Sequence, residues 1–252
     1  MQEQSAKPGI VKLPKKGIKN MIAVVSGKGG VGKSTVTALL ACELRRLGFS
    51  VGILDGDIGG ASIARLFGLT RENLEGYFAT SSNGIKILSF SLLAKDRERA
   101  TIWRGALVAN AIRQLYSRLD FGDLDYLLID SPPGTSDMPL TLYQFFPLDG
   151  IVTVTAPHSI VREVVSRSLQ MAKRLGVPVL GIIENFSYLK CSNCQKRHLI
   201  FGKTKTAERN SAKLLAELPM DERLAELEDA GNIQDYESPE IRKAVNSMLG
   251  KN

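Results

Sequence analysis

Short runs of apolar residues recur along the chain, separated by longer stretches with helical spacing. Several runs are apolar without interruption, as expected of parallel strands that are covered on both faces of a sheet. The predicted strands lie at 21–26, 50–55, 85–90, 125–131, 150–156 and 177–184, and the predicted helices at 33–48, 104–119, 159–175 and 204–217, with shorter helices after 221. This alternation predicts an α/β domain with a doubly wound, mainly parallel sheet and helices on both faces.

The last amphipathic stretch, IRKAVNSMLG, has a single apolar face, formed by Ile241, Ala244, Val245, Met248 and Leu249. A short apolar face packs against a core more often than it lies on a membrane surface, so we expect core packing. No apolar run approaches the roughly 18 residues that span a bilayer, and the N-terminus lacks the apolar core of a signal peptide. The pattern therefore predicts a soluble cytoplasmic protein with no membrane partner.

The charge balance is basic, with 33 Lys and Arg against 26 Asp and Glu, an excess of seven. Five lysines and one glutamate within residues 1–20 supply four of those seven charges: Lys7, Lys12, Lys15, Lys16, Lys19 and Glu3. The remainder of the chain is close to balanced, so no nucleic-acid partner is expected. We predict a basic, flexible tail over 1–19, either solvated or in contact with an acidic partner, and one domain over 20–252.

One glycine-rich stretch, SGKGGVGKST at 26–35, contains the phosphate-binding pattern G-x-x-x-x-G-K-[ST] between a predicted strand and a predicted helix. Glycines let successive backbone N–H groups converge on phosphate oxygens, and the positive end of the helix adds to the attraction. We expect Lys33 to reach the β and γ phosphates and Ser34 to ligate Mg²⁺. A second lysine, Lys28, lies in the same loop, although a phosphate cradle needs only one.

Aspartates end two other predicted strands at the same edge of the sheet. DYLLIDSPPG places Asp130 where a carboxylate can hold Mg²⁺ through water. LDGDIGG places Asp55 and Asp57 where a carboxylate can orient the attacking water in hydrolysis. An Asp-Gly turn is the simpler alternative for the second stretch.

Of the three cysteines, Cys42 lies in a helical pattern and is most simply a buried core residue. Cys191 and Cys194 form a CSNC pair in a loop predicted near 186–203. Zinc sites and four-iron clusters usually take four ligands, so two thiolates do not complete either. His198 as a third ligand, a redox pair, two chains that pool their cysteines, and a free thiol pair all remain open.

Six stretches stand in the order found in one known family: GKGGVGKST, LDGDIGGASI, IWRG, DYLLIDSPPGTSD, VPVLGIIENFSYLKCSNC and IFG. Over roughly residues 20–235 the chain resembles the Mrp/ApbC family of iron–sulfur cluster carrier ATPases. That family belongs to the deviant Walker A class of P-loop NTPases. The phosphate loop alone defines the class, whereas IWRG and ENFSYLKCSNC are typical of the carrier family.

The resemblance implies a role for each matching residue. Lys28 reaches across a nucleotide-sandwiched homodimer to the partner's phosphates, Lys33 acts within its own chain, and Asp57 orients the water. Cys191 and Cys194 hold a [4Fe–4S] cluster that bridges the two subunits. The residues implied to bind the nucleotide are Gly27, Lys28, Gly29, Gly30, Val31, Gly32, Lys33, Ser34, Thr35 at the α-phosphate and Asn185 at the adenine, with Mg²⁺ on Ser34 and Asp130.

The chain departs from the family pattern at three positions. Ser192 stands where the family commonly has proline between the cysteines, Ala61 replaces a proline after LDGDIGG, and His158 stands where glutamine is frequent. None of these removes an expected ligand or phosphate contact. No role is assigned to His158, His198 or Asp55.

The resemblance therefore implies a cytoplasmic ATPase that turns over slowly and passes a labile cluster to recipient apo-proteins, with scaffold proteins as further partners. Two alternatives come from other classes. A spatial-organising ATPase of the partition or division type would leave the cysteine pair idle. A nucleotide-binding regulator would carry zinc at the cysteines in place of the iron–sulfur cluster.

Overall fold

The computed structural model describes residues 12–57, 62–93, 112–114, 116–132, 134, 137–157, 159–191, 193–200, 202 and 206–251. Its elements follow in the order β1 (Ile18–Ser26), α1 (Lys33–Arg46), β2 (Val51–Asp55), α2 (Ile63–Leu66), η1 (Arg71–Asn73), β3 (Leu74–Glu75), β4 (Phe78–Thr80), β5 (Lys86–Ser89), α3 (Phe90–Leu93), β6 (Leu124–Asp130), α6 (Asp137–Phe145), β7 (Gly150–Thr155), α7 (Ser159–Arg174), β8 (Val179–Lys190), β9 (Arg197–His198), α8 (Thr206–Arg209), β10 (Leu214–Met220), α9 (Glu222–Ala230), η2 (Ile233–Asp235) and α10 (Pro239–Met248).

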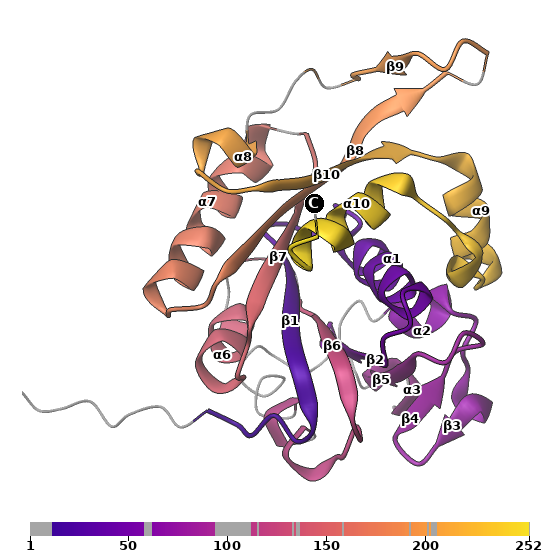
Figure 1. Ribbon diagram of the computed structural model, residues 1–252, viewed down its shortest axis with the longest axis vertical. Helices are drawn as coiled ribbons and strands as arrows, with labels where there is room; N and C mark the ends of the chain where they lie inside the picture. The colour runs from indigo at the N-terminus through magenta and orange to yellow at the C-terminus, as the bar shows by residue number, and fades with distance from the viewer. Residues whose placement is uncertain are drawn as a thin grey trace, which may run out of the picture.

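The strands form one sheet in the order β10-β8-β7-β1-β6-β2-β5-β4-β3, with β9 paired to β8. The seven strands from β10 to β5 run parallel, whereas β3, β4 and β9 pair antiparallel with their neighbours. Helices α6 and α7 lie on one side of this sheet, and α1, α9 and α10 lie on the other (Figure 1). The predicted doubly wound α/β fold is confirmed.

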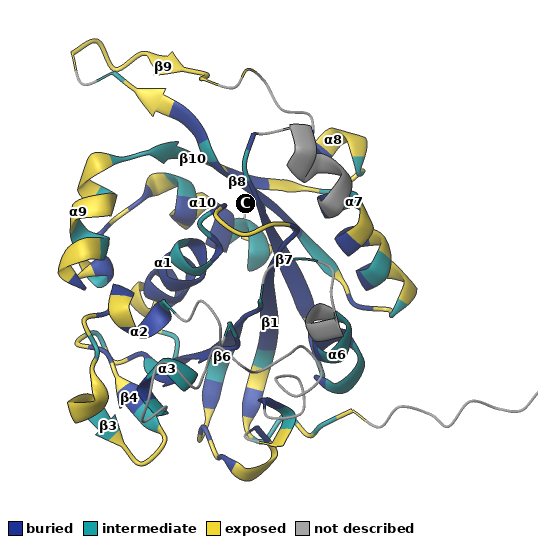
Figure 2. Ribbon diagram, turned by 180° about the vertical axis from the view of Figure 1, so that it is seen from behind, coloured by how far each residue is buried: buried dark blue, intermediate teal, exposed yellow. Residues whose placement is uncertain are grey.

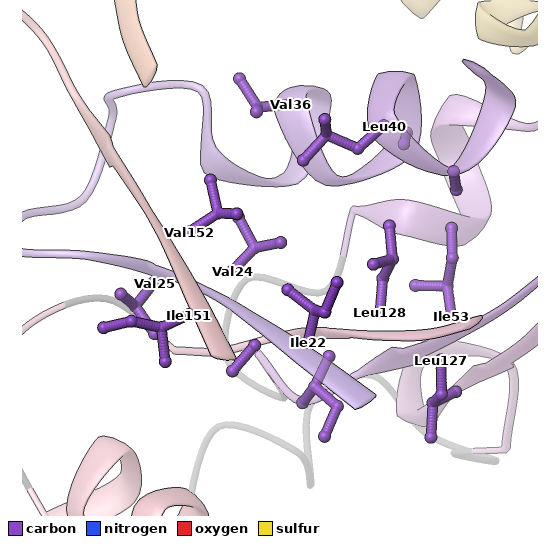
Figure 3. Packing of buried hydrophobic residues seen from close by; sticks show 14 of the residues in the cluster. Ile22, Val24, Val25, Val36, Leu40, Ile53, Leu127, Leu128, Ile151 and Val152 are labelled. Atoms are coloured by element: carbon purple, nitrogen blue, oxygen red, sulfur yellow. The ribbon is translucent and has the colours of Figure 1, made fainter. Parts of the chain in front are cut away.

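The core is built from alternate residues of the central strands. In Figure 3, Val24 of β1 points toward Val36 and Leu40 of α1, while Val25 points to the opposite face of the sheet. Both valines are at most 1% exposed. Because successive side chains of a strand point to opposite faces, a strand covered on both faces is apolar throughout. This explains why MIAVVS and the other central strands have uninterrupted apolar runs.

The fold begins earlier than the sequence analysis expects. The expected boundary between residues 19 and 20 falls inside β1, which starts at Ile18. Lys15 forms an ion pair with Asp149 at 2.6 Å, and the Lys16 ammonium donates to three backbone carbonyls between residues 116 and 119. Lys15 and Lys16 of the expected tail are therefore bound to the domain. Residues 1–11 of the expected tail lie outside the described residues.

One predicted helix is wrong in its second half. Of the range 204–217, the structure describes 206–217, where the helical part is the short α8; the last residues, 214–217, lie in strand β10, which pairs parallel with β8. LLAEL consists of good helix formers, but pairing with the edge of the sheet outweighs that local preference. Of the predicted helix 104–119, residues 112–114 and 116–118 are helical, and 104–111 and 115 lie outside the described residues.

Cys42 and most of the expected apolar face of α10 are buried, and Met248 and Leu249 of that face are half-buried against the core. Cys42 is fully buried, and the face of α10 made by Ile241, Ala244 and Val245 is at most 2% exposed against the core. Packing of this helix in the core is therefore confirmed. Within the described ranges, no helix combines the length and apolarity needed to cross a bilayer.

Candidate functional site

The phosphate loop connects β1 to α1 at the carboxyl edge of the sheet. Gly30 and Gly32 have φ angles of 79° and 75°, in the left-handed region that favours glycine. Gly32 caps α1, which begins at Lys33, so the helix starts directly behind the loop. A pocket of about 320 Å³ opens over the loop, lined by Ser26, Lys28, Gly29, Gly30, Val31, Gly32, Lys33, Ser34, Thr35, Asp57 and Ser62.

A buried cluster of polar groups lies at the floor of this pocket. The Lys33 ammonium is 2.7 Å from Asp130 Oδ2, and the two side chains are 6% and 0% exposed. The Ser34 hydroxyl donates to the same oxygen at 2.6 Å, and the Thr37 hydroxyl donates to Asp130 Oδ1 at 2.7 Å. Three donors thus surround the carboxylate, which offsets the cost of burying its charge. The structure brings together the three residues that the sequence selected for phosphate and metal binding.

This donor set fits Mg²⁺. The ion prefers oxygen ligands and usually binds through one or two protein groups plus phosphates and water. Ser34 Oγ, in the first turn of α1, and Asp130 Oδ2, at the carboxyl end of β6, supply two such oxygens side by side. Thr37, one turn beyond Lys33 on the same side of α1, is a member of the cluster that the sequence analysis missed.

The other lysine of the loop lies in a different environment. Lys28 is exposed, and no hydrogen bond or ion pair joins its ammonium to another described residue. The loop is shaped here through its backbone instead, because the Ser26 hydroxyl donates to the Lys28 carbonyl at 3.1 Å. The two lysines therefore differ sharply, since Lys33 is enclosed within its own chain and Lys28 is presented to the surroundings.

The two aspartates after β2 have different positions. Asp57 lines the pocket and is half-buried. Asp55 is fully buried, accepts a hydrogen bond from Ser89 Oγ at 2.8 Å, and accepts one from the Asp57 backbone N–H at 3.3 Å. Burial, and secondly the charge of Asp130 on the neighbouring strand, raises the pKa of Asp55 to about 7. Asp55 thus orients the backbone of Asp57, a role that the sequence analysis did not assign.

Asn185 lies beneath the loop. Its side chain is 2% exposed, and its Nδ2 donates to the Val31 carbonyl at 3.1 Å. The contact is so close that a Cβ on Gly32 would lie 2.2 Å from that nitrogen. Asn185 belongs to β8, so the strand that carries the cysteine pair at its end also supports the phosphate loop.

The cysteine pair lies in a hairpin between β8 and β9. Cys191 directly follows β8 and closes the turn through backbone hydrogen bonds with Lys196 at 3.0 Å and Gln195 at 2.9 Å. β8 and β9 extend beyond the body of the domain and are largely exposed there (Figures 1 and 2). Cys194 is exposed and Cys191 is half-buried. The hairpin presents both thiols at the surface, past the carboxyl edge at which the phosphate loop lies.

The hairpin also favours the thiolate form of one cysteine. Backbone N–H groups of Cys194 and Asn193 donate to the Cys191 sulfur, with a further contribution from the Cys194 thiol, and lower the pKa of Cys191. A thiolate is the form that binds metals. Among the described residues, no group of three or more His, Cys, Asp and Glu is placed to hold a metal, so His198 does not complete a site with the pair.

Several sequence features fall outside the described residues. IWRG at 102–105, Ala61, His158 and Ser192 are among them. The described residues include a contact that the sequence did not predict, in which Thr35 of the loop donates a hydrogen bond to Glu228 of α9. No local pattern relates these two residues, because they are 193 positions apart.

The chain matches known proteins over nearly its whole length. A family model described as ParA, NUBPL iron-transfer P-loop NTPase, matches residues 17–251. The iron–sulfur cluster carrier protein of Methanocaldococcus jannaschii is 43% identical over 249 residues, which cover 93% of this chain and 85% of that protein. The iron–sulfur cluster carrier protein of Clostridium perfringens is 39% identical over 234 residues, with 87% and 82% covered.

A solved structure is similar as well. The nucleotide-binding protein of Archaeoglobus fulgidus in complex with ADP superposes with a TM-score of 0.79 at 39% sequence identity. The match covers 90% of this chain and 92% of that one.

Proposed function

Because the chain belongs to the ParA family of NUBPL-type iron-transfer P-loop NTPases, we propose that it is a homodimeric, ATP-dependent carrier of a labile [4Fe–4S] cluster. The cluster is held between two subunits and passed to apo-proteins. The observation that carries this proposal is the combination, in one chain, of a phosphate loop and an exposed cysteine pair that the same strand, β8, connects.

The nucleotide-binding part of the proposal depends on the buried cluster under the pocket. Lys33 exchanges its contact with Asp130 for the β and γ phosphates, and Ser34 and Asp130 are the residues that would hold Mg²⁺. When bound, the ion would supply positive charge beside the phosphates. Asp57 orients a water molecule that attacks the γ-phosphorus, so that the bond to the β-phosphate oxygen breaks and ADP and phosphate leave.

The proposal of a dimer depends on Lys28. Its exposed ammonium lines the pocket without a partner among the described residues of its own chain, and it can therefore bind phosphates held by a second subunit. A γ-phosphate that is bound from both sides favours the closed dimer, and hydrolysis removes that differential contact. ATP hydrolysis then times the opening of the dimer, for which slow turnover is sufficient.

The proposal of a shared cluster follows from the number of ligands that the cluster needs. One chain offers two thiols in the hairpin, whereas a [4Fe–4S] cluster takes four. Two copies supply the four thiolates, and the lowered pKa of Cys191 favours the thiolate that the cluster needs. Exposure of the hairpin permits the cluster to leave as well as to bind. Recipient apo-proteins, with scaffold proteins as donors, are the partners that such a carrier requires.

Anaerobic reconstitution with iron and sulfide tests the proposal. We expect an absorption band of a [4Fe–4S] cluster and close to four iron and four sulfide per two chains. Cys191→Ser should abolish the cluster and leave ATP affinity nearly unchanged, because the hairpin lies outside the pocket. Bound zinc without iron would overturn the carrier function. Equal rates of cluster transfer with ATP, with ADP and without nucleotide would refute the coupling.

A further inference from the structure

A carboxylate contacts the phosphate loop from a distant part of the chain. Thr35, in the first turn of α1, lines the pocket, and its hydroxyl donates a hydrogen bond to Oε1 of Glu228. Glu228 lies near the end of α9 and is half-buried. The contact places a negative charge beside a site whose other features, the loop N–H groups and two lysines, favour anions.

The chemistry of the threonine makes this contact exclusive. A hydroxyl has one proton to donate, and an ionised carboxylate and a phosphate oxygen are both acceptors. Thr35 can therefore donate to Glu228 or to a phosphate, but not to both. On the proposed function, which places Thr35 beside the α-phosphate, we propose that Glu228 competes with the nucleotide for Thr35 and thereby sets nucleotide affinity.

The surrounding contacts allow the Glu228 side chain to move while α9 stays in place. At its start, α9 is capped by Asp221, which accepts hydrogen bonds from the N–H groups of Arg223 and Leu224 and one from Tyr236 Oη at 2.8 Å. Glu228 has flexible side-chain torsions and can turn away when a phosphate approaches. Binding of the nucleotide then requires loss of one charge-assisted hydrogen bond.

The far end of α9 packs against α2 and the residues that follow it. Asp229 forms an ion pair with Arg65 of α2 at 3.4 Å. Beyond the helix, Gly231 packs so closely on Gly68 that a Cβ on Gly231 would lie 2.5 Å from the Gly68 Cα. These contacts help to hold α9 in place against α2 when the Glu228 side chain turns away. Thr35 contacts the α-phosphate, so the competition is the same for ADP and ATP.

The test compares dissociation constants of Mg-ADP and of a Mg-bound, non-hydrolysable ATP analogue by calorimetry. Glu228→Ala should bind each nucleotide roughly three- to tenfold more tightly, because no partly exposed charge-assisted hydrogen bond has to be broken first. Glu228→Gln should improve affinity less than Glu228→Ala, because its amide oxygen still accepts a hydrogen bond from Thr35. Glu226→Gln, an equal change of charge on the exposed side of α9, should stay within about twofold of the parent protein. Without nucleotide, Glu228→Ala should lower the Tm, because the hydrogen bond to Thr35 is lost.

A second background separates competition from plain repulsion. In Thr35→Val no hydroxyl proton is shared, so Glu228→Ala, which removes the acceptor, should improve affinity less than in the parent protein. An equal improvement in both backgrounds would refute competition for the proton. Unchanged or weaker binding in Glu228→Ala, while the parent protein binds both nucleotides, overturns the inference and leaves the proposed function intact. A parent protein that binds neither nucleotide overturns both.

Discussion

Replacement of Lys33 by methionine should cost both stability and nucleotide binding, whereas the same replacement of Lys28 should cost function alone. Lys33 and Asp130 form an ion pair at 2.7 Å with side chains 6% and 0% exposed. Removing one partner of a buried pair costs roughly 3–5 kcal/mol, because the other charge is left uncompensated. Ser34 and Thr37 still donate to the carboxylate, so we expect the lower end of that range.

Urea denaturation followed by circular dichroism, without nucleotide at pH 7.5, measures this loss. A cost of about 3 kcal/mol corresponds to a midpoint lower by roughly 1 M for a domain of this size. Lys28→Met should unfold within about 0.5 kcal/mol of the parent protein, since its side chain is exposed. Calorimetry with Mg-ADP should show binding lost in Lys33→Met and largely kept in Lys28→Met. Equal midpoints for the two variants would refute the buried pair as the structure shows it.

Three further expectations follow from the same geometry. The pKa of Asp55 is raised from 3.8 to about 7 in the folded protein, so between these values the folded protein holds a proton that the unfolded chain releases. The free energy of unfolding should therefore fall as the pH rises from about 4 to 7. Asp55→Asn should make that fall smaller when urea denaturation is compared at pH 5 and pH 8. Alkylation at pH 7 should modify Cys191 well before Cys42, because burial raises the pKa of Cys42 to about 12 whereas the pKa of Cys191 is lowered. Mass spectrometry of peptides taken over time measures the order of modification, and the reverse order would contradict this expectation. Gly32→Ala should destabilise the protein by more than Gly30→Ala in thermal unfolding, because both need positive φ but only the former meets a neighbouring atom within 4 Å.

The local features of this chain are the ones that its sequence predicts. The phosphate loop is contiguous, and its glycines and the following helix specify its shape, so the loop and the start of α1 follow from ten residues. The buried parallel strands follow from uninterrupted apolar runs, because only a sheet covered on both faces accommodates several of them. The fold class was predictable for this reason.

The features that the sequence does not predict depend on contacts between distant residues. β10 has the composition of a helix and becomes a strand through pairing with β8. Glu228 contacts Thr35, which is 193 positions away in the sequence. The pKa of Asp55 is raised because the side chain is buried and lies beside the charge of Asp130. Neither propensity nor spacing contains this information, since it arises from the way in which the elements pack.

The native mass of the reconstituted protein, measured anaerobically with ATP by light scattering or native mass spectrometry, tests the shared cluster most directly. The account predicts a dimer that carries one [4Fe–4S] cluster. When Cys191 and Cys194 are both replaced by serine, no cluster-bearing dimer should form. A monomer of 27.5 kDa that carries a complete cluster of its own would contradict it.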